Sequence, residues 1–156
     1  MLYAQWIEGD PYVINEYNYD EDNSYISNID VNTTVNEFKQ NIELLGGYTV
    51  EVDFKTIDNK QVLYTGGKTK IYKNQVLYAE LTNVVSGDTN GDGKISYLDY
   101  VNVYNHIQKA KHPESTKKLL VNEYLSAGDM SKDNKISYLD YVIIYNNIKE
   151  LRGGSN

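Results

Sequence analysis

Two segments in the C-terminal half of the chain place oxygen-bearing residues at the spacing of a twelve-residue calcium-binding loop. Such a loop takes ligands from positions 1, 3, 5, 7, 9 and 12 and turns sharply at position 6. The first segment offers, in that order, Asp88, Asn90, Asp92, Lys94, Ser96 and Asp99, where Lys94 would contribute its main-chain carbonyl. The second segment offers Asp129, Ser131, Asp133, Lys135, Ser137 and Asp140. The spacing therefore predicts two sites for a hard cation, each binding one Ca²⁺ ion.

Neither segment follows the standard EF-hand pattern completely. The first ends on Asp99, which is one methylene shorter than the usual glutamate. The second has Asn134 in place of glycine at position 6, and asparagine adopts left-handed backbone more readily than other non-glycine residues. It also has Ser131, a poorer ligand than Asn90. We therefore expect the second site to bind Ca²⁺ more weakly than the first.

The two segments belong to an internal repeat, which argues against a chance acidic turn. Residues 87–107 and 128–148 are identical at 14 of 21 positions, with a constant offset of 41 residues. A solvated Asp/Asn turn that caps a helix would explain one such loop, but not two that run into the same sequence. Mg²⁺ fits less well, because it prefers to keep several of its waters.

Each loop runs into a predicted helix with two apolar stripes. At about 100° per residue, Tyr100, Val103 and Ile107 fall on one side of the first helix. One stripe suffices to pack a helix on a core, so the second predicts an exposed surface that binds a partner. The alternative is that both stripes are buried, within the domain or against residues 1–85. The second stripe comprises Tyr97, Leu98, Val101, Tyr104 and Asn105 in the first copy, and Tyr138, Leu139, Val142, Tyr145 and Asn146 in the second.

The segment between the repeats is predicted to be helical from about residue 114 to 124, because Pro113 suits the entry to a helix. These elements predict an all-α domain at 87–150, followed by a flexible tail at 151–156. No helix is expected directly before either loop. The two histidines, His106 and His112, receive no role.

Residues 1–86 are predicted to form a small β-rich domain with one helix, which makes the whole chain α+β. The helix is expected at 33–45, from a capping box of Thr34 and Glu37 to the glycine pair at 46–47. Because the junction at 83–87 is short and not rich in Pro or Ser, the two domains are expected to pack together. Strands are expected at 12–19, 25–31, 48–54, 61–65, 68–72 and 76–85, with 61–65 pairing back on 48–54 across a turn at 58–60.

The composition argues against several classes of function. A net charge of −7 disfavours nucleic-acid binding, which needs Lys and Arg for the phosphates. The absence of cysteine excludes disulfides and thiolate metal sites. No apolar run approaches the roughly 20 residues of a membrane span, and residues 1–10 lack the basic start and apolar core of a signal peptide. The sixteen tyrosines suit exposed binding faces.

The first domain shows no group of residues that predicts catalysis. It has no histidine, and its acids cluster in loop-like sequence. Two carboxylates could hydrolyse a glycoside, but solvated loop acids are far more common. We therefore expect no enzyme activity here, although the chain could be a fragment of a larger protein that carries an enzyme domain. The acids in question are Glu8, Asp10, Glu16, Asp20, Glu21 and Asp22.

Residues 87–150 resemble the dockerin module of cellulosome-type assemblies. The opening GDTNGDGKIS at 87–96 is close to the hallmark of that family, and aspartate at position 12 agrees with it. The resemblance implies two bound Ca²⁺ ions and docking of a parent protein to a cohesin module on a scaffold or partner protein. It also implies that loop positions 10 and 11 and helix positions 17 and 18 contact the cohesin. These are Tyr97, Leu98, Tyr104 and Asn105, and Tyr138, Leu139, Tyr145 and Asn146.

Many type I dockerins have small hydroxyl residues at positions 10 and 11 and basic residues at 17 and 18, so this chain is expected to take a more apolar cohesin. The resemblance also implies that the duplicated surface could bind in two orientations. Lys109 and Glu150, at equivalent positions, break the symmetry. By position and composition, residues 1–86 resemble the X-modules that often precede dockerins, which implies a stabilising or spacing role.

The sequence therefore predicts a secreted interaction module that is a monomer when free and reaches the cell surface through its partner, in a parent that acts on polysaccharide. One alternative is an intracellular calcium sensor, disfavoured by the presence of only two methionines. Another is a calcium-binding structural or sugar-binding accessory region of a secreted glycoside hydrolase. In that case Trp6 and several tyrosines would stack on a sugar.

Overall fold

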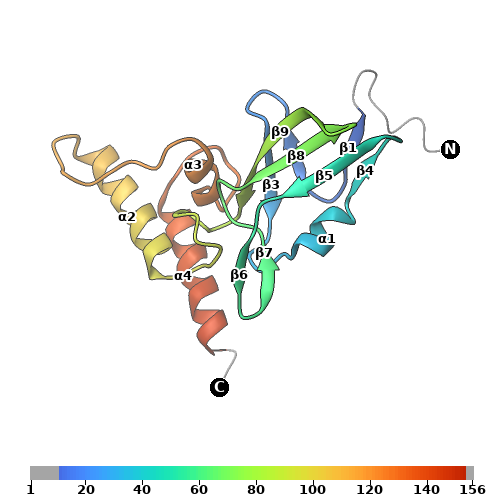
Figure 1. The fold of residues 1–156 in the computed structure, drawn as a ribbon. Coiled ribbons are helices and arrows are strands. Elements are labelled where there is room, and N and C mark those ends of the chain that lie inside the picture. Colours follow the sequence, from blue (N-terminus) through green and yellow to red (C-terminus); the bar gives the residue numbers. More distant parts are fainter. Residues whose placement is uncertain (1–10, 154–156) are drawn as a thin grey trace.

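The computed structural model describes residues 11–153 and has the predicted α+β architecture, a β-rich unit followed by helices (Figure 1). We call residues 11–85 the N-terminal unit and residues 86–153 the C-terminal unit. The expectations for residues 1–10, including Trp6, Glu8 and Asp10, lie outside the described residues, as does the end of the predicted tail at 154–156. Within the described range, none of the helices combines the length and hydropathy of a membrane span.

A five-stranded sheet forms the centre of the N-terminal unit. Neighbouring strands are antiparallel, except for one parallel pair, β3 and β9. The longest strand, β9, lies in the middle and leads directly into the C-terminal unit. In spatial order the strands are β2 (Asn18–Asp20), β3 (Tyr25–Ile29), β9 (Val76–Val85), β8 (Lys68–Lys73) and β5 (Tyr48–Val52).

Two short ladders complete the unit. β1 (Tyr12–Ile14) pairs with β4 (Ile42–Leu44), and β6 (Lys55–Ile57) pairs with β7 (Lys60–Val62). The turn predicted at 58–60 is confirmed, but β7 folds back on β6 and not on β5, because β5 pairs with β8 instead. The strand predicted at 12–19 is broken, since Glu16 takes a left-handed φ of 69° between β1 and β2.

The helix predicted at 33–45 is correct only in its first part. α1 (Val35–Lys39) begins at the predicted capping box, in which the hydroxyl of Thr34 accepts the N–H of Glu37 and the Glu37 carboxylate accepts the N–H of Thr34. The helix ends early because Ile42 enters the ladder between β1 and β4, where its side chain is buried. Gly47, predicted to cap this helix, instead forms the turn before β5 with a φ of 88°.

The core of the N-terminal unit gathers side chains from the sheet, α1 and the ladder between β1 and β4. Burial of such apolar groups contributes roughly 25 cal/mol per Å² removed from water, so this cluster holds the short elements in place. Its most deeply buried members are Ile26, Ile29, Phe38, Leu63, Ile71 and Val85.

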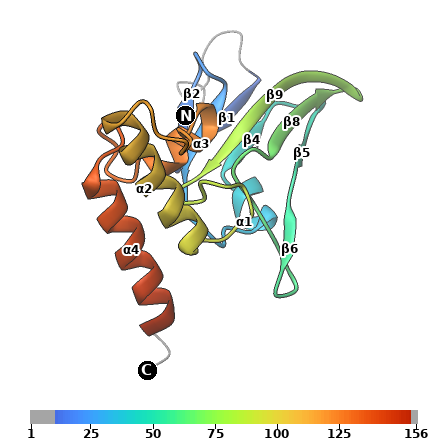
Figure 2. The same cartoon turned by 90° about the vertical axis from the view of Figure 1, so that its left-hand side faces the viewer.

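Three helices form the C-terminal unit: α2 (Tyr97–Lys111), α3 (Asn122–Gly128) and α4 (Tyr138–Gly153). Figures 1 and 2 show α2 and α4 side by side and running in opposite directions. Between them, Val103 and Ile107 of α2 pack against Ile144 and Ile148 of α4. α4 continues to Gly153, so the predicted tail at 151 begins too early.

A helix lies between the repeats as predicted, but its predicted bounds of 114–124 are wrong. Residues 113–121 lie along the last turns of α2 without regular structure, and α3 begins only at Asn122. Contacts with α2 hold this segment, because Lys109 Nζ donates to the carbonyl oxygens of Pro113 and Ser115, and the N–H of Leu120 donates to His106 Nδ1 at 3.0 Å. His106 therefore has a structural role that the sequence did not reveal.

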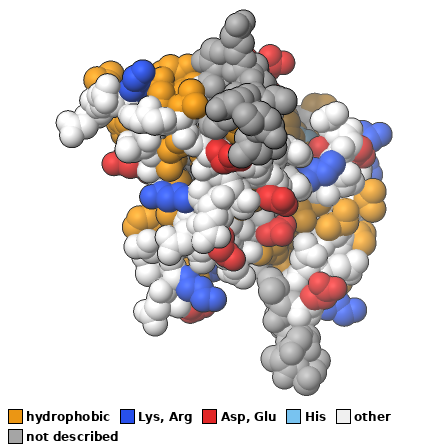
Figure 3. All heavy atoms as spheres, turned by 90° about the vertical axis from the view of Figure 1, so that its right-hand side faces the viewer, with side chains coloured by type: hydrophobic (Ala, Val, Ile, Leu, Met, Phe, Trp, Pro, Cys, Tyr) orange, Lys and Arg blue, Asp and Glu red, His pale blue; other side chains and the backbone are white. Residues whose placement is uncertain are grey.

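The two units pack against each other, as the short junction predicts. α3 lies against β9 and β3 and runs directly into the second acidic loop, contrary to the expectation that no helix precedes a loop. Within the C-terminal unit, α3 and the second loop hold the segment that follows β9, because the N–H of Gly87 donates to the carbonyl of Ala127 at 2.8 Å and Lys132 Nζ donates to Ser86 Oγ at 3.2 Å. Figure 3 shows the side of the N-terminal unit that faces away from the C-terminal unit. Its surface is mixed, and the hydrophobic side chains lie mainly toward the edges.

Candidate metal loops and partner-binding face

The first loop, residues 88–99, brings three carboxylates together. Asp88, Asp92 and Asp99 each offer an oxygen, and these atoms lie within 4.8 Å of one another. No Lys or Arg in the described part of the chain forms an ion pair with them. Asp88 and Asp99 are fully buried, and burial raises the pKa of Asp88 to about 6 and that of Asp99 to about 7. Buried like charges call for a compensating cation, and an all-oxygen donor set fits Ca²⁺.

Asp88 organises the backbone of this loop. Its Oδ1 accepts the N–H groups of Gly91 and Asp92, and its Oδ2 accepts the N–H of Gly93, each at 3.0 Å. Gly91 and Gly93 have φ angles of 77° and 81°, which glycine adopts without steric cost. A fourth donor comes from the N-terminal unit, because the N–H of Thr65 bonds to Asp88 Oδ2 at 3.0 Å.

Asp99 joins the two ends of the first loop. Its Oδ1 accepts the N–H of Thr89 at 2.8 Å, and its Oδ2 accepts the N–H of Ser96 at 2.8 Å. Together with Ser96, Asp99 forms a capping box at the start of α2. The last predicted ligand thus also fixes the helix that carries the partner-binding stripe.

The remaining predicted positions of the first loop lie nearer to solvent. Asn90 Nδ2 donates to Asp92 Oδ2 at 3.4 Å, which places both side chains on the same side of the loop. The Lys94 side chain is exposed, as expected of a residue that would contribute its main-chain carbonyl. Ser96 serves as the N-cap of α2, where its hydroxyl accepts the N–H of Leu98.

The second loop, residues 129–140, repeats this arrangement with more exposure. Asp129, Asp133 and Asp140 again offer oxygens within 4.8 Å of one another. Asp140 is buried and accepts the N–H groups of Ser131 and Ser137, each at 2.8 Å. The Lys135 side chain is exposed like its counterpart in the first loop.

Asn134 occupies the sharp turn of the second loop. Its φ is 68°, and its N–H donates to Asp129 Oδ2 at 2.8 Å, as that of Gly93 does to Asp88. The left-handed turn therefore survives without glycine. Both loops fit Ca²⁺ by their donor chemistry.

The stripes predicted to bind a partner are exposed on both helices, except that Asn105 is only partly exposed and faces the connecting segment. Leu98 and Leu139 are 60% and 55% exposed, and Val101 and Val142 are 42% and 45% exposed. Neither the domain core nor the N-terminal unit covers them, which removes the alternative of two buried stripes. We call this surface the aromatic face and define it by Tyr97, Leu98, Val101, Tyr104, Asn105, Tyr138, Leu139, Val142, Tyr145 and Asn146.

Stacked tyrosines join the two halves of the aromatic face. The rings of Tyr100 and Tyr141 lie 4.4 Å apart, and each also contacts two tyrosines of the face. Tyr97 meets Tyr100 edge-on, just as Tyr138 meets Tyr141. Tyr145 meets Tyr100 at 5.7 Å, as Tyr104 meets Tyr141 at 5.8 Å. The contacts of one repeat thus reappear in the other.

The sequence placed Tyr100 on the core-facing stripe, and Tyr100 does pack against that core, but its ring contacts with the tyrosines of the face were not predicted. The signal was present, since both repeats carry tyrosine at this position. Side chains at the ends of the helices break the symmetry. Lys109 is held by the 113–115 segment, whereas Glu150 is exposed, and Lys111 Nζ lies 4.7 Å above the ring of Tyr138.

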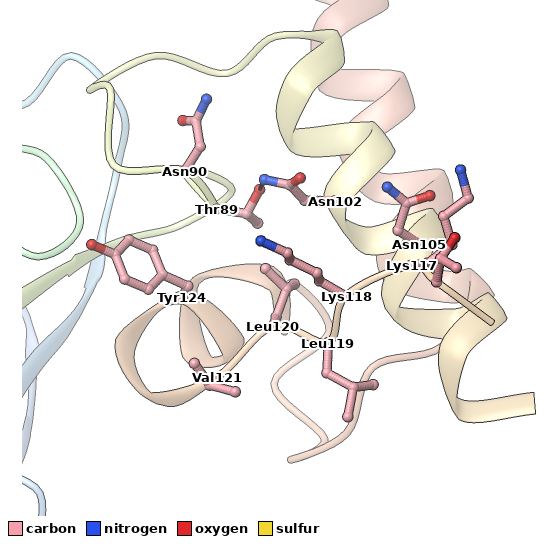
Figure 4. Close-up of a pocket in the computed structure, with 11 residues that line it drawn as sticks. Thr89, Asn90, Asn102, Asn105, Lys117, Lys118, Leu119, Leu120, Val121 and Tyr124 are labelled. Carbon is pink, nitrogen blue, oxygen red and sulfur yellow. Dashed lines mark hydrogen bonds between the residues drawn. The ribbon is translucent and has the colours of Figure 1, made fainter. Parts of the chain in front are cut away.

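A cavity of about 480 Å³ opens beside the first loop (Figure 4). Thr89 and Asn90 of the loop, Asn102 of α2 and Lys118 of the connecting segment contribute to its lining. Asn102 Nδ2 donates to Thr89 Oγ1 at 3.2 Å, which ties α2 to the start of the loop. This groove lies between the loop and the connecting segment, and Leu120 of that segment and Tyr124 of α3 add apolar surface to its lining.

The C-terminal unit has the features of a small interaction module. It contains two acidic loops, and each loop leads into a helix that carries half of an exposed apolar face. Residues 86–149 match the model of the dockerin type I domain family. The C-terminal unit is therefore a dockerin module, and dockerins are calcium-binding modules that bind cohesins. Neither the curated proteins nor the solved structures gave a significant match to the chain.

Proposed function

We propose that this chain anchors its parent protein to a cohesin-bearing complex through the aromatic face, with one Ca²⁺ ion in each EF-hand-like loop. The observation that carries this proposal is the nearly equal exposure of equivalent apolar residues on α2 and α4. Exposed Tyr, Leu and Val side chains gathered in one patch are typical of an interface core. The cohesin would therefore present a largely apolar surface.

The calcium ions would be structural. Asp99 and Asp140 each join a loop to the first turn of a face-bearing helix, so a cation bound there would hold Tyr97 and Tyr138 in place. Extracellular calcium modules operate at affinities of roughly 10⁻⁴ to 10⁻³ M. Sites of modest affinity would thus suffice in a secreted parent, which we propose to be a polysaccharide-active protein held at the cell surface through its partner.

The N-terminal unit would support the dockerin as an X-module does, without catalysis of its own. Among residues 11–153, the clusters of three acidic groups that could hold a metal are the two loops, and both belong to the C-terminal unit. The close packing of α3 on β9 and β3 favours a stabilising role over that of a flexible spacer.

Binding of the full chain to a panel of purified cohesins, measured by calorimetry in calcium and in chelator, tests the proposal. Val101→Asp and Val142→Asp each place a charge in one half of the aromatic face. We expect the double variant to lose at least about 30-fold in affinity, as for a hot-spot residue. Val76→Asp is the matched control, because Val76 is 69% exposed at the far end of β9.

The single variants test the two binding orientations. If each repeat can dock alone, Val101→Asp and Val142→Asp would each retain binding through the other helix, and crystals of the two complexes would show opposite orientations. Loss of binding in only one single variant would instead show that one orientation is used. A double variant that binds like the wild type would refute the assignment of the face.

A further inference from the structure

The first loop is packed against the N-terminal unit, and the second is not. Asp88 has no exposed surface, and Thr65 of the N-terminal unit donates to its carboxylate. Gly93 lies against Ile57 and Leu63 of the same unit. In the second loop, Asp129 is partly exposed and borders a groove of about 380 Å³, whose other wall includes Asp20 and Tyr25 of the N-terminal unit. The repeat is symmetric in sequence, but its two loops have different neighbours.

The N–H of Thr65 is held in a fixed position by β9. The Thr65 hydroxyl donates to the carbonyl of Val85 at 3.2 Å and accepts the N–H of Val85 at 3.0 Å. Next to Thr65, the N–H of Gly66 donates to the carbonyl of Asn83 at 3.0 Å. The N–H of Asn83 in turn donates to the carbonyl of Gly67 at 2.8 Å. The turn at 64–67 is thus tied to β9, the central strand of the sheet, and it presents a preformed donor to the first loop.

The residue at position 4 of each loop shows how closely the first loop approaches the turn at 64–67. It is Gly91 in the first loop and Lys132 in the second, and both have left-handed backbone with φ of 77° and 63°. The loop itself therefore accepts a side chain at this position. At Gly91, however, a Cβ atom would lie 2.8 Å from the carbonyl oxygen of Thr65 and 3.3 Å from the ring of Tyr124. The N-terminal unit, not the loop, requires glycine there.

We propose that the first cation site is shared between the two units: the turn at 64–67 holds Asp88, so that Ca²⁺ in the first loop and docking of the N-terminal unit strengthen each other. The second loop binds its cation independently of this turn. Coupling of this kind is reciprocal, because each event must stabilise the other by the same free energy. The inference concerns calcium alone and does not depend on the cohesin face.

Hydrogen exchange of the full wild-type chain, with saturating Ca²⁺ and with chelator, tests one direction of the coupling. We expect Ca²⁺ to slow exchange of the amides at 65–67 by roughly ten-fold, within the usual range of coupling between sites. The amides of β5, at the far edge of the sheet, serve as the internal reference. Unchanged exchange at 65–67 would overturn the proposal, and this measurement needs no variant that must fold.

Calorimetry with Ca²⁺ tests the other direction. Asp140→Ala removes the last ligand of the second loop. The Ca²⁺-binding isotherm of this variant therefore reports the first loop alone. On this background we expect Gly91→Ala to weaken Ca²⁺ binding roughly ten-fold. Gly47→Ala is the matched control, because Gly47 has a φ of 88° but open space around an added Cβ. Equal losses in the two variants, or none in Gly91→Ala, would refute the shared site.

Discussion

The hydroxyl groups of Tyr100 and Tyr141, which occupy the same position in the two repeats, are hydrogen-bonded to each other between α2 and α4. When a residue bonds to the equivalent residue of the other repeat, the bond lies on the local twofold axis that relates the two repeats. The ring contacts on either side repeat across this axis, so the pair marks the centre of the aromatic face. The symmetry seen in the sequence is therefore also present in the packing.

Removing either hydroxyl of this pair should weaken the C-terminal unit. We expect Tyr100→Phe and Tyr141→Phe each to lower the free energy of unfolding by about 1 kcal/mol, the usual worth of a hydrogen bond. Since both variants delete the same bond, the double variant should cost less than the two single losses added together. Thermal denaturation measures these values, and fully additive losses would contradict the bond.

The hydrogen bond between Tyr100 and Tyr141 predicts that the hydroxyl of Tyr141 loses its proton only at high pH. Hydrogen bonding to Tyr100 and burial raise the pKa of Tyr141 to about 12. Because the folded state favours the neutral phenol, this stabilisation is present below the ordinary pKa of about 10 and is lost as pH rises through about 12. NMR titration of the labelled tyrosine rings should show that the pKa of Tyr141 is lower in Tyr100→Phe than in the wild type. An unchanged titration curve would rule out the bond as the cause.

Removal of calcium should destabilise the C-terminal unit. Without a cation, the buried carboxylates of Asp88 and Asp99 lack a compensating charge. A ligand at a thousand times its Kd stabilises a protein by about 4 kcal/mol per site, so chelation should lower the melting temperature markedly. Circular dichroism with and without chelator measures the effect. Equal melting under both conditions would exclude a structural role for the ions.

The second loop should bind Ca²⁺ more tightly when its turn contains glycine. Asn134 has a φ of 68°, a conformation that glycine adopts at lower cost. We expect Asn134→Gly to improve the affinity of the second loop by up to about five-fold, corresponding to about 1 kcal/mol. Calorimetry should show this gain without a change at the first loop. If the first loop of the wild-type protein binds Ca²⁺ more weakly than the second, the expectation that the first site is the tighter one is wrong.

Acidification should loosen the segment that joins the repeats. Burial lowers the pKa of His106, whose Nδ1 accepts the N–H of Leu120. The folded state thus favours neutral imidazole, so this stabilisation is complete above the unfolded pKa of about 6.5 and is lost as pH falls toward the lower folded value. Hydrogen exchange of Leu120 in saturating calcium should accelerate between about pH 7.5 and 5.5 relative to His106→Asn, whose acceptor does not titrate. Identical pH profiles in the two proteins would exclude His106 as the cause.

The features that depend on nearby residues were predictable from the sequence. The capping box of Thr34 and Glu37, the strand at Val76–Val85 and the two stripes on α2 all follow from residue spacing over one or two turns. Spacing also selects the carboxylates of both loops, because a metal loop takes its ligands from one short segment.

Only the tertiary structure decided which distant segments meet. Ile42 has the spacing of a helix but pairs with β1, residues 113–121 lie along α2 instead of coiling, and Thr65 reaches Asp88 across 23 positions of the chain. Local periodicity does not encode these choices, because their free energy comes from burial and hydrogen bonds between segments that are far apart in sequence. The chain alone thus specified two loops that differ only in a few of their own residues, and the fold gave them different surroundings by packing the N-terminal unit against the first.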